Sequence, residues 1–326
     1  MHQTTDTPSA TAKQGRDPAA HATPATAAEN RGWLEAHAWL LLRRFNQFGV
    51  LFMFLLGPLF GAWLVTGNLS SSMTLGILPL TDPLLLAQSI LSGSWPALTG
   101  IIGALLVLVF YALLGGRVFC SWVCPMNLVT DLAAWLRRHW GIRGGPRLSR
   151  NLRWWLLGLV LLLPPLTGVM VWELVNPISM LHRGIIFGFG WAWLLIASVF
   201  LYDLLLVRHG WCGHLCPVGA CYGLIGAMAP VHIAADRRQN CDDCMDCFEV
   251  CPEPQVIKPA LKGGAKGIGP IIDSIDCTKC GRCVEVCHQD VFRLALGWEA
   301  VAAGTGSWCH RQQCFRQSPM DIHWFR

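Results

Sequence analysis

Two runs of cysteine near the C-terminal end constrain this 326-residue chain more than any other feature. Each run has the spacing C-x2-C-x2-C-x3-C, and a proline follows the first. Their members are Cys241, Cys244, Cys247 and Cys251, followed by Pro252, and Cys277, Cys280, Cys283 and Cys287. This spacing is typical of thiolates that bind [4Fe–4S] clusters, so the eight cysteines predict two clusters. Zinc sites usually show separate C-x2-C pairs instead.

The pairing of cysteines with clusters follows from the spacing of each run. In proteins with two such clusters, three cysteines of one run wrap three corners, and the last cysteine of the other run supplies the fourth. We therefore expect two crossed sets of ligands. One set is Cys241, Cys244, Cys247 and Cys287, and the other is Cys277, Cys280, Cys283 and Cys251. A small ferredoxin-like α+β domain over residues 241–298 should hold both clusters.

The composition points to a membrane protein. Charged residues make up only 14% of the chain and hydrophobic residues 53%, whereas about 25% of the residues of a soluble domain are charged. Four apolar runs, residues 48–66, 97–114, 154–172 and 185–207, are each long enough to cross about 30 Å of hydrocarbon. They predict a membrane all-α domain with four transmembrane helices over residues 33–240. The net charge of +5 is modest and does not indicate nucleic-acid binding.

The distribution of Lys and Arg predicts the orientation of this domain. Residues 67–96 contain neither, and residues 173–184 contain only Arg183. Seven arginines lie between the second and third apolar runs: Arg117, Arg137, Arg138, Arg143, Arg147, Arg150 and Arg153. By the positive-inside rule, both termini and the cysteine runs face the cytoplasm, in the inner membrane of a bacterium. Residues 1–32 are expected to form a disordered tail, and residues 299–326 a polar tail with Cys309 and Cys314.

A second cysteine motif, C-x3-C-P, occurs twice. It follows the second apolar run at Cys120 and Cys124, and the fourth run at Cys212 and Cys216. Residues i and i+4 share one face of an α-helix, so each motif should present two thiols side by side. Four thiols brought together would suit an additional iron, a zinc ion or another redox centre. Buried free cysteines, a reversible dithiol pair and a docking surface stay open as alternatives. Cys221 is interpreted as a spare buried thiol.

Four segments of the chain, residues 39–67, 119–138, 209–223 and 244–254, resemble the NapH family. These are ferredoxin-type membrane subunits of the quinol dehydrogenase of periplasmic nitrate reductase systems. Related MauN-type and NosR-type membrane ferredoxins accompany methylamine dehydrogenase and nitrous oxide reduction. The resemblance extends from Trp33 to Trp298. It implies membrane lipid and quinol as partners, together with a periplasmic NapG-like iron–sulfur subunit and a c-type cytochrome.

Two functions are compatible with this resemblance. The first is an electron-transfer subunit that passes electrons from the quinol pool toward a periplasmic reductase. The second is a redox maturation factor for a periplasmic metalloenzyme of the methylamine dehydrogenase or copper-enzyme type. The first function leaves a gap, because the clusters are expected on the cytoplasmic side of a membrane about 30 Å thick. The C-x3-C-P motifs could provide an intermediate stop.

The sequence identifies no catalytic residue, but it offers four candidates for proton transfer. Oxidation of a quinol releases two protons and two electrons, so its site needs a proton acceptor beside an apolar slot. Asp82, Glu173 and His182 lie in the expected outer loops, and Asp203 lies near the end of the fourth apolar run. Asp203 could also neutralise Arg208 or Arg117. An ordinary polar residue at the membrane interface is an equally good interpretation of each of the four.

Overall fold

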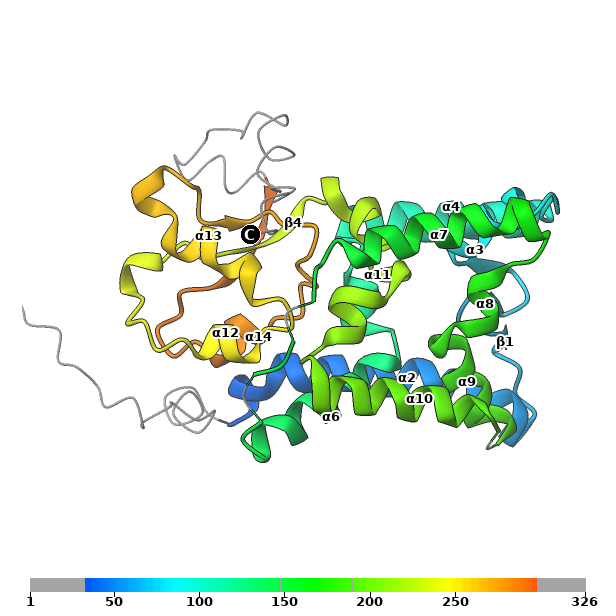
Figure 1. Cartoon of the computed structure of the whole chain (residues 1–326), viewed down its shortest axis with the longest axis horizontal. Coiled ribbons are helices and arrows are strands. Elements are labelled where there is room, and N and C mark those ends of the chain that lie inside the picture. Colours follow the sequence, from blue (N-terminus) through cyan, green and yellow to red (C-terminus); the bar gives the residue numbers. More distant parts are fainter. Residues whose placement is uncertain (1–32, 143, 147, 189, 298–326) are drawn as a thin grey trace, which may run out of the picture.

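The structure is a computed structural model that describes residues 33–142, 144–146, 148–188 and 190–297. Two parts lie end to end along the longest axis, a larger helical part and a smaller part with mixed helices and strands (Figure 1). The expected tails at 1–32 and 299–326, with Cys309 and Cys314, lie outside the described residues.

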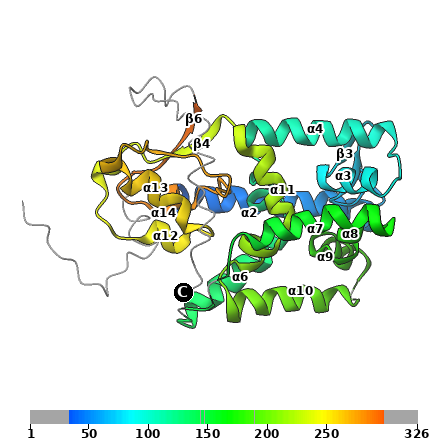
Figure 2. The same ribbon diagram turned by 45° about the horizontal axis from the view of Figure 1, so that its top comes forward.

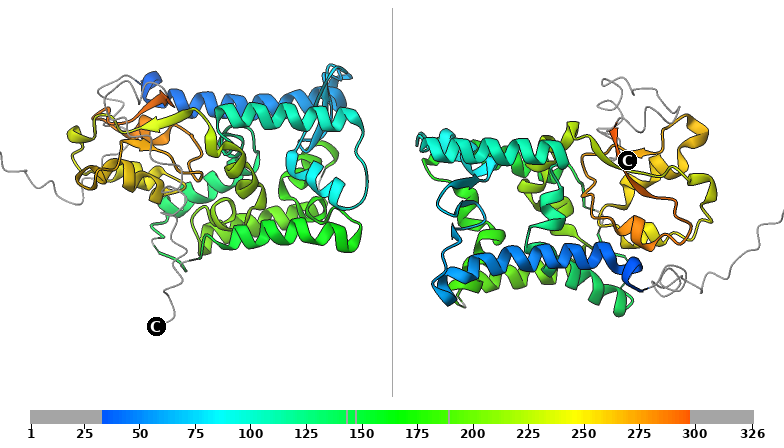
Figure 3. Two further views of the ribbon diagram at one scale, coloured as in Figure 1. Left: turned by 90° about the horizontal axis from the view of Figure 1, so that it is seen from above. Right: turned by 180° about the vertical axis from the view of Figure 1, so that it is seen from behind.

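Long apolar helices form the frame of the helical part. They run along the longest axis, with α4 and α7 on one side and α2 and α10 on the other (Figures 1 and 3). Their bounds are Trp33–Phe60 for α2, Leu98–Leu114 for α4, Leu152–Thr167 for α7 and Ala192–Leu201 for α10. Large apolar side chains on them are exposed, including Phe52 at 54% and Trp155 at 78%.

The structure only partly reproduces the four expected spans. Within the described ranges, one segment, Ala36–Phe60 of α2, is both long and apolar enough to cross a membrane. The other apolar helices are shorter, and the expected run 185–207 is divided. Helix α9 (Pro177–Phe187) ends at Gly188, whose φ of 95° is strained for residues other than glycine, and α10 begins at Ala192. The π-helical turn η1 (Tyr202–Leu206) continues α10.

The end of the helical part that lies away from the mixed part is not all-α. An antiparallel sheet of β1 (Val65–Gly67), β2 (Ser71–Thr74) and β3 (Leu78–Thr81) lies there with α8 (Val171–Val175) and α9 (Figures 1 and 2). Helix α3 (Pro83–Leu91) follows β3. Asp82 caps α3 and Asn176 caps α9, each accepting a hydrogen bond from a backbone N–H at 3.1 Å. A proline at the first position of each helix helps to set its start.

At the other end, short helices connect the frame to the mixed part. Their bounds are Val118–Trp122 for α5, Met126–His139 for α6, Trp211–Leu215 for the π-helical turn η2, Pro217–Ile225 for α11 and Gly226–Met228 for the 3₁₀ turn η3. Helix α11 packs against α4 and α7. The approach is close: a Cβ added at Gly116 would lie 1.5 Å from the carbonyl oxygen of Tyr222. Only glycine fits this position.

The mixed part is a small α+β unit that begins at β4, ahead of the expected boundary at residue 241, because β4 pairs with both later strands. Its sheet is antiparallel in the order β5-β4-β6, and Ile233 pairs with Ile272 and Leu294. The bounds of its elements are Val231–Ala234 for β4, Arg238–Asn240 for η4, Asp246–Val250 for α12, Pro254–Val256 for η5, Ile257–Lys262 for α13, Gly264–Lys266 for η6, Ile271–Ile272 for β5, Arg282–Val286 for α14 and Arg293–Leu296 for β6. Apolar residues of the sheet and α13 share one core with cysteines of both runs.

Candidate functional site: two cysteine-lined cavities and a third group of thiols

The eight cysteines of the two runs line two cavities in the mixed part. The outer cavity contains the thiols of Cys241, Cys244, Cys247 and Cys287. The inner cavity contains those of Cys251, Cys277, Cys280 and Cys283. Each cavity therefore combines three cysteines of one run with the last cysteine of the other. The structure brings the thiols together in the two crossed sets that the spacing predicts, while their ligation of iron stays a prediction.

Both runs wrap their cavity with the same backbone conformation. The residue before the second cysteine is left-handed in each run, with φ of 64° at Asp243 and 49° at Lys279. The residue after it is left-handed as well, at Met245 (66°) and Gly281 (75°). Helices α12 and α14 begin directly afterwards and carry the third cysteine of each run. The repeated conformation indicates that the two cavities are built to hold the same kind of group.

The chemistry of the thiols fits a metal cluster. Burial raises the pKa of Cys244 and of Cys277 to about 11, and that of Cys247 to about 12. Thiols with such pKa values keep their protons at pH 7, so a cluster must displace the protons when it binds. Each cavity offers four sulfur ligands, the number that a [4Fe–4S] cluster requires.

The two cavities differ in their surroundings. The loop of the inner cavity is fastened to the helical part: Ser121 Oγ donates to the carbonyl of Thr278 at 2.8 Å, and Trp122 Nε1 donates to that of Lys279 at 3.2 Å. The outer cavity is lined partly by Asp242, Asp243 and other exposed residues. The inner cavity therefore faces the helical part, and the outer cavity lies toward the free end.

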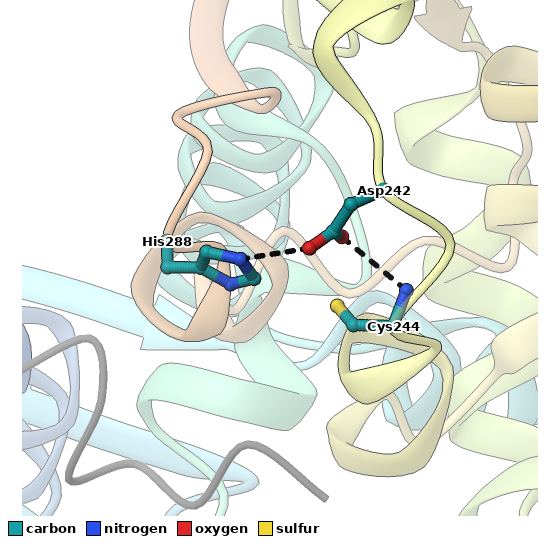
Figure 4. Close-up of side chains that lie close together, drawn as sticks. All are labelled: Asp242, Cys244 and His288. Atoms are coloured by element: carbon teal, nitrogen blue, oxygen red, sulfur yellow. Dashed lines mark hydrogen bonds and ion pairs between the residues drawn. The ribbon is translucent and has the colours of Figure 1, made fainter. Parts of the chain in front are cut away.

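A polar contact joins the two runs beside the outer cavity (Figure 4). Asp242 accepts a hydrogen bond from the backbone N–H of Cys244 at 3.3 Å, and its other oxygen lies 2.9 Å from His288 Nε2. A carboxylate, a thiol and an imidazole within 4.8 Å of one another could by themselves hold a metal ion. Because Cys244 also lines the outer cavity, such an ion would compete with a cluster. We interpret the contact as a clamp that holds the crossed runs together.

The two C-x3-C-P motifs do not form continuous α-helices. Helix α5 ends between Cys120 and Cys124, and Cys212 lies in the π-helical turn η2, which ends before Cys216. In both motifs the N–H of the second cysteine donates to the carbonyl five residues earlier, at 2.9 Å. The expectation of one helix face per motif was therefore wrong. The proline after each motif has no N–H and disfavours helical geometry at the cysteine before it, so a new helix starts there.

The two motifs nevertheless come together. Burial raises the pKa of Cys124 far above its usual value, and the neighbouring thiolates of Cys120 and Cys216 raise it further. Burial likewise raises the pKa of Cys212, which also has the other three cysteines as electrostatic neighbours. We call Cys120, Cys124, Cys212 and Cys216 the four-thiol site. It lies under the loop of the inner cavity, next to α11.

A network of buried charges links the four-thiol site to the inner cavity. Arg117 forms an ion pair with Glu253 at 3.1 Å and donates to the carbonyls of Asp276 at 2.8 Å and Cys212 at 3.1 Å. Arg153 pairs with Asp276, and Arg150 lies 3.5 Å from Glu253. Sequence reasoning missed this network. The sequence features that could have predicted it are an arginine shortly before each C-x3-C-P motif and Glu253 directly after Cys251 and Pro252.

Two of the four proton-transfer candidates have clear structural partners. Glu173 pairs with Arg183 at 3.4 Å and accepts hydrogen bonds from Ser70 and Asn176, each at 3.3 Å. Asp203 is fully buried and accepts a hydrogen bond from the N–H of Trp211 at 2.9 Å. The expected pairing of Asp203 with Arg208 or Arg117 is not formed, because those arginines reach into the mixed part instead.

The other two proton-transfer candidates, His182 and Asp82, have fewer polar partners. His182 is 2% exposed, its ring packs edge-on against Phe54 at 4.6 Å, and neither ring nitrogen has a hydrogen-bond partner among the described residues. Burial lowers the pKa of His182 to about 4, so the ring is neutral at pH 7. Burial raises the pKa of Asp82 to about 6, against the effect of hydrogen bonds from the backbone of Leu84 and from Tyr222. Tyr222 stacks on Phe119, next to Cys120.

Comparison with known families agrees with these observations. Residues 96–143 and 189–232, which contain the four-thiol site, match a family described as "4Fe-4S binding domain". Residues 240–291, which contain all eight cysteines of the two runs, match the family "4Fe-4S dicluster domain". The fold and the cysteine-lined cavities thus define an iron–sulfur protein of the ferredoxin type, a class that transfers electrons.

The relatives identify the family. The ferredoxin-type protein NapH of Escherichia coli (strain K12) is 49% identical over 85% of this chain and 96% of its own. NapH of Haemophilus influenzae is 48% identical, over 83% and 94%. The methylamine utilization ferredoxin-type protein MauN of Paracoccus denitrificans is 51% identical, over 82% and 94%. The chain belongs to the NapH family of ferredoxin-type proteins. Its identity to MauN is about as high as its identity to NapH. No solved structure matches it.

Proposed function

We propose that this chain is the membrane electron-transfer subunit of a quinol dehydrogenase that passes electrons toward a periplasmic reductase of the nitrate reductase type. The observation that carries the proposal is the order of the thiol groups. The outer cavity, the inner cavity and the four-thiol site follow one another from the free end of the mixed part into the helical part. A NapG-like iron–sulfur subunit and a c-type cytochrome are the proposed periplasmic partners, as the resemblance to the NapH family implies.

The proposal places the helical part in the inner membrane with four spans: α2, α4, α7 and α10 with η1. Exposed apolar side chains on these helices support it, since lipid would cover them. Helix α4 has 17 residues, about 26 Å at 1.5 Å per residue, slightly less than a typical hydrocarbon core. The arginines between α4 and α7 favour a cytoplasmic position for the mixed part and for both termini.

Each cavity is proposed to hold one [4Fe–4S] cluster, on the four cysteines that line it. Such a cluster supplies one-electron transfer when bound, and the chain supplies thiolates, enclosure and charge. The four-thiol site is proposed to hold a third metal or redox centre. A centre at this depth would shorten the distance that electrons must cover between clusters on the cytoplasmic side and partners on the periplasmic side.

For quinol we propose a site near Asp82 and His182, at the end of the helical part away from the clusters. Asp82 has a pKa close to neutral and can accept a proton. His182 has two buried ring nitrogens without hydrogen-bond partners among the described residues, and either could hold a quinol hydroxyl. Glu173, which already pairs with Arg183, and Asp203, which is held by the N–H of Trp211, are weaker candidates for this role.

Reconstituted membranes that contain the partner subunits test this function. We expect a quinol analogue to reduce the cytochrome only when this chain is present, and Asp82→Asn to slow the reaction about 100-fold, as for loss of a general base. With the wild-type chain the rate should fall below about pH 6, because a protonated Asp82 cannot accept a proton. The exposed Asp273→Asn serves as the control. Undiminished cytochrome reduction without this chain would contradict the proposal.

The four-thiol site can be tested by counting iron. We expect a variant with serine at positions 120, 124, 212 and 216 to bind less metal than the wild type while both EPR signals of the mixed part persist. Cys221→Ser, which removes a neighbouring thiol of the same core, is the matched control. An unchanged metal content in the fourfold variant would show that the site holds no metal.

The identity to MauN favours a second candidate function, a redox maturation factor for a periplasmic enzyme of the methylamine dehydrogenase or copper-enzyme type. The same clusters would then deliver electrons during assembly. In that case the reconstituted chain would not support quinol-dependent turnover of the cytochrome, and deletion of its gene would leave the target enzyme without its mature cofactor.

A further inference from the structure

Arg117 contacts both C-x3-C-P motifs and residues beside the inner cavity. It is 2% exposed. One end of its guanidinium binds Glu253 and the carbonyl of Asp276, which are neighbours of Cys251 and Cys277. The other end binds the carbonyl of Cys212, and the group also lies beside the thiol of Cys120. Segments far apart in the chain thus meet on one cation.

The path of this side chain is closely defined. It crosses α11 over two glycines, where an added Cβ would lie 3.9 Å from the guanidinium at Gly219 and 3.8 Å from the side-chain stem at Gly223. The guanidinium carries five N–H donors in a rigid plane, whereas a lysine ammonium carries three donors on one nitrogen. Arg117 therefore holds the two motifs and the cavity in a single relative geometry.

The charges around Arg117 do not cancel. Three guanidinium groups, those of Arg117, Arg150 and Arg153, face two carboxylates, those of Glu253 and Asp276, so the network carries one net positive charge. Arg208, which precedes the second motif, adds a further cation at the carbonyl of Cys251. A group in the inner cavity that gains an electron is stabilised by this charge, because the interior screens it weakly.

We propose that Arg117 is a positioning residue that couples the four-thiol site to the inner cluster and raises the reduction potential of that cluster. The proposal rests on the clusters of the proposed function. On reduction, the inner cluster takes up one electron and its net charge falls by one, while Arg117 keeps its charge. The outer cluster lies beyond the inner one and should feel this cation much less.

Redox titration followed by EPR, on the full-length purified protein with dithionite as reductant, tests the electrostatic half. We expect Arg117→Gln to shift the potential of the inner cluster downward and Glu253→Gln to shift it upward, with little change at the outer cluster. Arg117→Lys keeps the charge and should restore most of the potential. Shifts of the same sign in both neutral variants, or equal shifts at both clusters, would overturn the proposal.

Alkylation of thiols, measured by mass spectrometry on the same protein, tests the positioning half. In Arg117→Gln and Arg117→Lys we expect Cys120 and Cys212 to be labelled several-fold faster. Both variants lose the guanidinium group that contacts the thiol of Cys120 and the carbonyl of Cys212. Arg150→Gln is the control, since it removes a cation from Glu253 but leaves the bond to Cys212. Unchanged labelling in both Arg117 variants would contradict positioning. Absence of cluster signals from the wild type would instead overturn the proposed function.

Discussion

Replacing Cys251 with alanine is expected to remove the inner cluster and leave the outer one in place. Cys251 belongs to the first run in sequence, yet it lines the cavity formed by Cys277, Cys280 and Cys283. A cluster with three remaining thiolates is readily lost, so the iron of the mixed part should fall from about eight to about four atoms per chain. Iron analysis and EPR of anaerobically purified protein measure this loss.

Double variants decide whether the ligands cross. In the Cys251→Ala background, a further Cys277→Ala should cost no more iron, because both cysteines serve the same cluster. A further Cys241→Ala should remove the remaining cluster. The reverse pattern would mean that each run holds its own cluster and that the two cavities do not correspond to ligand sets. Iron at the four-thiol site would add the same amount to every variant and would not change the comparison.

Replacing Asp131 with asparagine is expected to cost about 3–5 kcal/mol of the free energy of unfolding, as for a broken buried ion pair. Asp131, on α6, binds Arg282 at the start of α14 through both carboxylate oxygens at 2.6 Å, and Arg44 of α2 at 2.7 Å. Without the carboxylate, the buried Arg282 loses its ion-pair partner. Unfolding of the purified protein in mild detergent measures the loss.

The matched control for Asp131 is Asp236→Asn. Asp236 pairs with Arg293, whose side chain is 51% exposed, and exposed pairs contribute about 0–1 kcal/mol. A similar loss in both variants would show that the cost does not come from burial of the charges at Asp131. A negligible loss at Asp131 would mean that the mixed part is held on the helical part mainly by its backbone hydrogen bonds.

The same ion pair predicts a dependence on pH. Burial alone would raise the pKa of Asp131, but the cations around it, Arg282 first, outweigh burial and hold the pKa well below its usual range. A folded-state pKa below the unfolded value of about 3.9 stabilises the protein above that pH. The stability difference between wild type and Asp131→Asn should therefore be full above about pH 4 and shrink as the pH falls further. A constant difference down to pH 2 would exclude this carboxylate as its source.

Features that depend on near neighbours in the chain were predictable. The spacing of three cysteines over seven residues sets which thiols can wrap one cluster, so the crossed sets at Cys251 and Cys287 followed from the pattern. The apolar runs located α4 and α7 within a few residues. The helix predicted over residues 185–207 was too long, because hydrophobicity alone does not show that the backbone turns at Gly188. The prediction that each C-x3-C-P motif is α-helical was wrong, because Pro125 and Pro217 disfavour a helix that continues through the motif.

Contacts between distant segments were not predictable. Arg117 and Glu253 are 136 residues apart, and Arg282 and Asp131 are 151 apart. An arginine in a sequence shows that a charge must be solvated or paired, but its partner depends on which surfaces pack together. Cysteine spacing and hydrophobicity thus determined the chemistry of this protein, two cluster sites and an apolar frame. Tertiary packing alone decided that the inner site meets the four-thiol site across a buried cation, since that choice depends on long-range burial.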